Sequence, residues 1–141
     1  MGWLSNLFQS IVFQTVMSGV LVFILSEITQ RFYLEPLQKF KEVVGKIDNK
    51  LKFYANVIAH PGNLLPRETI LESGRTLRDL SCGLEATYKQ IPFKRNQTHQ
   101  KIADAARRLI RLSNSLGESG RGIENSDDVD KIRVDLSILE L

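Results

Sequence analysis

The first 26 residues of the chain carry no charged side chain, although 19 Lys and Arg and 16 Asp and Glu follow them. Within this segment, residues 3–25 form a run of 23 uncharged residues. As an α-helix this run would measure roughly 34 Å, which is enough to cross the hydrocarbon core of a bilayer. We therefore predict a transmembrane helix within residues 1–30.

A cleaved signal peptide is the alternative interpretation of this segment. It would need a basic start and a small-residue cleavage site, whereas the sequence begins Met-Gly-Trp. The cations near the span all follow it, and by the positive-inside rule the C-terminal part is expected in the cytoplasm. These cations are Arg31, Lys39, Lys41, Lys46, Lys50 and Lys52.

Polar and small residues interrupt the predicted span. Ser10, Gln14 and Ser18 are spaced by four and share a helix face, because 3.6 residues make one turn. A lone helix would leave the amide of Gln14 without a partner in lipid, so we predict that the helix associates with copies of itself. A narrow pore lined by these residues is a more specific version of this prediction. Alternatively, the helix tolerates these residues near water in the outer half of the membrane. The predicted interface or pore residues are Gln9, Ser10, Gln14, Thr15, Ser18 and Gly19.

The rest of the chain, residues 31–141, has apolar residues at helical spacing and no strand pattern. The stripes predict helices over residues 36–58, 66–91, 96–116 and from Ser126 to the C-terminus. Gly117 is expected as the left-handed residue after the third helix, and residues 117–125, with three glycines, as a mobile loop. The predicted fold class is all-α, an N-terminal transmembrane helix followed by an antiparallel four-helix bundle.

Few residues carry recognisable chemistry. Glycine-rich phosphate loops and metal-binding motifs are missing, so we expect neither a cofactor nor a metal. The single cysteine, Cys82, is expected to be a small buried residue.

A basic surface is predicted on the third helix of the bundle, and the C-terminal residues 118–141 are acidic. This separation of positive and negative charge along the chain predicts ion pairs within the chain or between subunits. Lipid head groups or nucleic acid are the alternative anionic partners of the basic surface. No aromatic residues interleave with the cations, which argues against single-strand binding by stacking. The predicted basic surface consists of Lys101, Arg107, Arg108 and Arg111.

Arg95 and His99 are four residues apart at the start of the same helix. An arginine and a histidine so placed can hold a phosphodiester and move a proton, which makes them weak catalytic candidates. A helix start with exposed polar residues would give the same pattern.

Three short segments resemble a group of uncharacterised bacterial single-pass membrane proteins with a cytoplasmic helical bundle. They are Phe53-Tyr54-Ala55-Asn56, Leu77-Arg78-x-Leu80-Ser81 and Leu109-Ile110-x-Leu112-Ser113-Asn114. This resemblance implies a shared fold and the bacterial inner membrane.

Arg95-Asn96 and His99 also resemble the ribonuclease motif of HEPN domains, with a spacing one residue shorter than usual. The layout of a span and a bundle is similar to that of membrane-anchored, divergent-HEPN accessory proteins of type VI CRISPR systems. That similarity implies a ring that perturbs the membrane during antiphage defence.

Three functions follow from the sequence. The first is a self-associating, non-enzymatic membrane protein, in its most specific form a membrane-perturbing or pore-forming defence effector. The second is a membrane-tethered HEPN-like ribonuclease. The third is an adaptor that holds a cytoplasmic protein at the membrane. Membrane lipids and further copies of the chain are the expected partners, and nucleic acid is not expected.

Overall fold

The computed structural model describes residues 11–61, 66–92 and 96–137, and this part of the chain contains helices and no strand. The predicted all-α fold is therefore confirmed. The chain divides into two compact units, residues 1–35 and residues 36–141.

The first unit contains helix α2, Ile11–Thr29, followed by a π-helical segment, η1, at Gln30–Leu34. Pro36 explains the wider turn, because proline has no N–H and its ring clashes with the carbonyl four residues earlier. The amide of Glu35, just before this proline, instead donates to the carbonyl of Gln30, five residues back. The sequence predicted a first-turn proline or a kink at this position.

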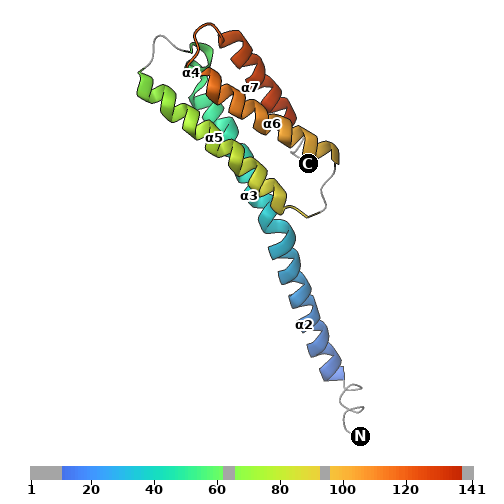
Figure 1. The fold of residues 1–141 in the computed structure, drawn as a ribbon. Helices are drawn as coiled ribbons and strands as arrows, with labels where there is room; N and C mark the ends of the chain where they lie inside the picture. The colour runs from blue at the N-terminus through green and yellow to red at the C-terminus, as the bar shows by residue number, and fades with distance from the viewer. Residues whose placement is uncertain (1–10, 62–65, 93–95, 138–141) are drawn as a thin grey trace. The chain divides into compact units, whose positions relative to one another are not determined.

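The second unit is the predicted antiparallel bundle, with α3, α5, α6 and α7 lying alongside one another (Figure 1). Tyr54 interrupts the helix expected over residues 36–58 and separates α3 from the short helix α4. The helices are α3 Glu35–Phe53, α4 Ala55–Ala59, α5 Arg67–Gln90, α6 Asn96–Ser115 and α7 Gly122–Ser137.

The core of the bundle consists of the apolar stripes that face its centre. Each long helix of the bundle contributes at least one fully buried aliphatic residue. These residues are Ile47, Leu77, Leu84, Leu109 and Ile132. A fully buried aliphatic side chain contributes about 1.5–3 kcal/mol, so these stripes are the main source of the bundle's stability.

Small residues set the close packing of α5 against α6. The hydroxyl of Ser81 donates to the carbonyl of Ala106 over 2.9 Å, and a Cβ added at Gly74 would lie 3.3 Å from the carbonyl oxygen of Ser113. Arg78 donates from Nε to the hydroxyl of Ser113 over 2.9 Å. The second and third segments on which the resemblance rests therefore contact each other, and their residues serve packing.

The loop before α7 is shorter than the sequence predicted. Helix α7 begins at Gly122, four residues before Ser126, whose hydroxyl donates to the carbonyl of Gly122 inside the helix. A Cβ at Gly122 would lie 2.3 Å from the carbonyl oxygen of Ala59, so glycine is required here for close approach. The positive φ occurs at Gly120 (89°), whereas Gly117 does not adopt the predicted left-handed conformation.

Asn125, expected in that loop, is buried in the first turn of α7. Its amide donates to the carbonyl of Ile58 over 3.3 Å and its oxygen accepts from Ser115 over 2.6 Å. These two hydrogen bonds tie α7 to α4 and α6, which explains why a polar, glycine-rich sequence is helical here.

Candidate functional site

Helix α2 is the most unusual surface in the described part of the chain, because none of its residues is buried. Val12, Phe23 and Leu25 are more than 60% exposed. A helix that is apolar on all sides is stable only when lipid or other protein covers it. Among the described residues, this is the one helix long and apolar enough to cross a membrane.

Two hydroxyls among the predicted interface residues are satisfied within α2 itself. Thr15 donates to the carbonyl of Ile11 and Ser18 to that of Thr15, both over 2.9 Å. These hydroxyls therefore need no second helix. Gln14 is exposed on the same face as Ser18. Gln9 and Ser10 lie outside the described residues.

The neighbouring face of α2 carries the small residues Thr15 and Gly19. A Cβ added at Gly19 would meet no heavy atom within 4 Å, so the backbone is open to close approach there. Small residues four apart allow two helices to come close enough for extensive van der Waals contact in lipid.

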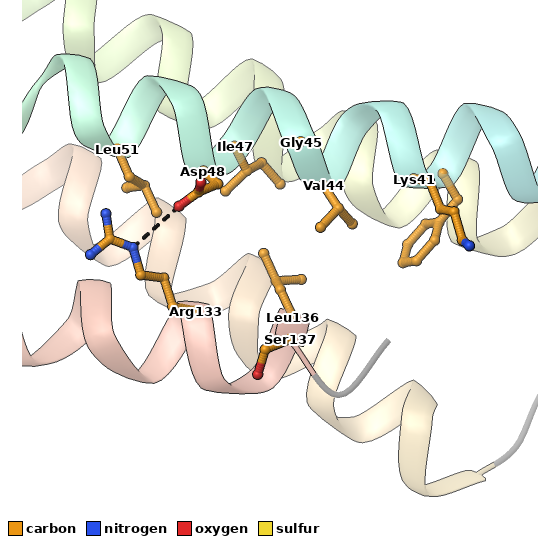
Figure 2. Close-up of a pocket in the computed structure, with 10 residues that line it drawn as sticks. Lys41, Val44, Gly45, Ile47, Asp48, Leu51, Arg133, Leu136 and Ser137 are labelled. Carbon is orange, nitrogen blue, oxygen red and sulfur yellow. Dashed lines mark hydrogen bonds and ion pairs between the residues drawn. The ribbon is translucent and has the colours of Figure 1, made fainter. Parts of the chain in front are cut away.

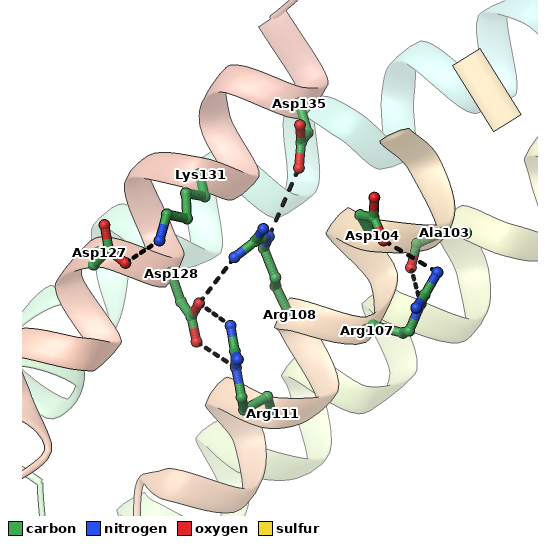
Figure 3. Close-up of polar contacts among 9 residues, drawn as sticks. All are labelled: Ala103, Asp104, Arg107, Arg108, Arg111, Asp127, Asp128, Lys131 and Asp135. Carbon is green, nitrogen blue, oxygen red and sulfur yellow. Dashed lines mark hydrogen bonds and ion pairs between the residues drawn. The ribbon is translucent and has the colours of Figure 1, made fainter. Parts of the chain in front are cut away.

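The predicted basic surface on α6 is neutralised by the chain's own last helix (Figure 3). Asp128 of α7 accepts from Nε of Arg111 over 2.8 Å and from Nη1 of Arg108 over 3.3 Å, and its side chain is 8% exposed. Its hydrogen bond raises the pKa of Arg111 above the ordinary arginine value. The predicted internal pairing therefore occurs between α6 and α7.

The other cations of that surface carry little uncompensated positive charge. Arg107 pairs with Asp104 of its own helix at 3.1 Å, and Lys101 is half-buried. Arg108 also lies 3.8 Å from Asp135. Because each of the three arginines has a carboxylate of this chain, α6 offers few uncompensated charges to an external anion.

Of the two catalytic candidates, the structure describes only His99. His99 is exposed, and its ring stacks edge-on against that of Tyr88 with 5.8 Å between the centroids. Arg95 lies outside the described residues. No cluster of three or more His, Cys, Asp or Glu that could hold a metal ion occurs in the described ranges.

Cys82 is exposed on α5, so the prediction that it is a small buried residue was wrong. The buried positions of this helix include Leu77, Ser81, Leu84 and Tyr88. Cys82 follows Ser81 by one residue, about 100° around the helix, so it points away from the core. The helical period therefore placed Cys82 off the buried face. It predicted the exposure of this residue better than the general tendency of free cysteines to be buried.

A groove of about 530 Å³ lies between α3 and α7, and no sequence pattern predicted it. Arg133 and Asp48 approach to 3.3 Å at one end, and Lys41 lies at the other end (Figure 2). The hydrogen bond from Lys52 is the main cause that lowers the pKa of Asp48, with a smaller contribution from Arg133. Between these ends the lining is apolar and includes Val44 and Leu136.

Comparisons with known proteins leave the site to be interpreted from its own chemistry. No family model matches this chain, and searches of curated proteins and of solved structures return no match.

Proposed function

We propose that this chain is a non-enzymatic, single-pass membrane protein that self-associates through α2 and presents the helical bundle to the cytoplasm. The observation that supports it is the exposure of α2: its apolar side chains extend around the whole helix, and no residue of it is buried. The eleven Val, Leu, Ile and Phe residues of α2 together favour insertion by about 3–7 kcal/mol.

The orientation of the bundle can be tested with Cys82, the single cysteine of the sequence. Its side chain is exposed on α5, so a membrane-impermeant maleimide labels it wherever the bundle faces the reagent. We expect labelling in inverted membrane vesicles and none in intact spheroplasts. Labelling in intact spheroplasts, or a mature protein that lacks the first two dozen residues, would contradict the proposed anchor and its orientation.

Self-association is supported by the side chains on one part of α2. Gln14 and Ser18 share a face, and the open backbone at Gly19 lies beside Thr15 on the next face. In lipid, helices associate through van der Waals contact at small residues and through hydrogen bonds between polar side chains of neighbouring helices, and this part of α2 carries side chains of both kinds.

The variant Gln14→Leu tests this interface in the full-length protein. We expect it to shift the protein toward monomer in chemical cross-linking of membranes and in detergent at micromolar concentration. Val20→Leu is the control, because it also changes one side chain of α2 but lies about 120° around the helix from Gln14 and about 100° from Gly19, away from both faces. A wild-type protein that is monomeric, or an equal effect of both variants, would refute self-association through this face.

The membrane-perturbing form of this function predicts a further effect. Wild-type protein reconstituted in liposomes should release an entrapped dye, and Gln14→Leu should release less. If the protein assembles without releasing dye, the adaptor function fits better, with the assembled bundles as the binding platform.

A further inference from the structure

Helix α3 carries five lysines, and the structure divides them into two groups. Lys46 pairs with Glu42 at 2.7 Å and Lys52 with Asp48 at 2.6 Å. Lys50 lies over the rings of Phe53 and Tyr54, 5.3 and 5.6 Å from their centroids. The three lysines farthest along the chain from α2 therefore each have a partner within the chain.

Among the described residues, the two lysines nearest to α2 have no such partner. Lys39 and Lys41 are exposed, and neither makes an ion pair with any residue that the structure describes. Glu35 lies one turn before Lys39, at a spacing that permits an ion pair, but no such pair forms. Lys41 also lies at the end of the groove farthest from the Asp48–Arg133 ion pair (Figure 2).

These two lysines follow the apolar segment closely in the chain. Helical residues continue without a gap from Ile11 to Phe53, and Leu34 is an exposed apolar residue in that run. Lys39 comes five residues after Leu34 in the chain, and Lys41 comes seven residues after it. The headgroup layer of a bilayer is about 5–8 Å thick on each side, and a lysine stem is long enough to reach it.

We infer that Lys39 and Lys41 bind the anionic phospholipid headgroups of the cytoplasmic leaflet, and that Lys46, Lys50 and Lys52 do not. The inference rests on the proposed function, because it needs α2 to be in the membrane. Anionic headgroups attract cations placed within a Debye length of the surface, and an ammonium already paired with a carboxylate gains little from them. The pairing pattern of α3 thus leaves charge uncompensated only where lipid phosphate is near.

The double variant Lys39→Gln/Lys41→Gln tests this inference in the full-length, detergent-purified protein. Native mass spectrometry with added phosphatidylglycerol or phosphatidylcholine measures the lipid that stays bound. We expect the double variant to lower the apparent affinity for phosphatidylglycerol roughly 10- to 30-fold, because each lysine near such a surface contributes about fivefold. Affinity for phosphatidylcholine should not change.

The matched control is Lys46→Gln/Lys52→Gln, which removes the same number of positive charges from the same helix. We expect it to retain phosphatidylglycerol with less than a threefold change in affinity. An equal loss in both double variants, or no loss in Lys39→Gln/Lys41→Gln, would overturn the inference. Alkaline carbonate extraction of membranes reports anchoring separately, so a wild-type protein that is extracted contradicts the proposed function instead.

Discussion

Replacing Asp128 by asparagine tests whether α6 and α7 are held together by charge. The carboxylate of Asp128 is 8% exposed, and it accepts hydrogen bonds from Arg111 and Arg108. Asparagine has nearly the same shape but no charge, and only one oxygen to accept hydrogen bonds. The substitution therefore removes the ion pairs while leaving the packing of α7 nearly unchanged.

The exposed fractions of the two arginines determine the size of the effect. Breaking a buried ion pair costs about 3–5 kcal/mol, whereas an exposed pair contributes only about 0.2–1 kcal/mol. Arg111 is 59% exposed and remains solvated, while Arg108 is 27% exposed and keeps only Asp135 at 3.8 Å. We therefore expect Asp128→Asn to lower the free energy of unfolding by about 2 kcal/mol, between these limits.

Urea unfolding of the full-length protein in detergent, followed by circular dichroism, measures this change. Asp127→Asn is the control, because Asp127 is 57% exposed and its ion pair is with Lys131, four residues along the same helix. The control should cost less than about 0.5 kcal/mol. If the two variants differ by less than that, the Arg–Asp contacts do not hold α7 in place and the reasoning fails.

Three further predictions follow from single contacts or candidate residues. Gly122→Ala should destabilise the bundle by about 1–3 kcal/mol, because the new Cβ meets the carbonyl of Ala59; Gly117→Ala, with open space around it, should change the free energy of unfolding by less than about 0.5 kcal/mol. Because Lys52 lowers the pKa of Asp48 below 3.8, the stability that this carboxylate contributes is present above that pH and is lost as the pH falls through its lower folded-state pKa. A titration of the unfolding free energy from neutral to acidic pH should therefore fall less steeply for Asp48→Asn, and identical profiles would contradict this. Purified wild-type protein and His99→Ala should both leave single-stranded RNA intact; cleavage that only the wild type performs would support the ribonuclease alternative.

Several features of the fold followed from the sequence because they depend on local periodicity. Apolar residues three and four apart in the chain meet on one helix face whatever the rest of the chain does, so the stripes predicted the core of the bundle. The helix ends shortly before Pro61 and Pro92 were predictable for the same reason, since proline prevents helix continuation locally. The exposure of Cys82 was predictable from the same periodicity, because its position relative to Ser81 places it off the buried face, but we expected it to be buried and that prediction was wrong.

Other features depended on contacts between residues distant in the chain. The break at Tyr54 and the helical state of Gly122 and Asn125 differ from what their local sequence suggested. A glycine next to polar residues is typical of a loop, but here its missing side chain admits the carbonyl of Ala59, and the amide of Asn125 bonds to Ile58. Such contacts stabilise a helix start that intrinsic propensity does not favour.

The amino-acid pattern alone was enough to predict that the N-terminal helix is long and apolar enough to cross a membrane and that an amphipathic, all-helical domain follows it. These conclusions depend only on the cost of exposing apolar surface and on the period of the helix. Which charges remain available to a partner depended instead on contacts between the helices. Arg108 and Arg111 are compensated by Asp128, whereas Lys39 and Lys41 are not compensated by any described residue, because an ion pair requires two side chains to meet within about 4 Å.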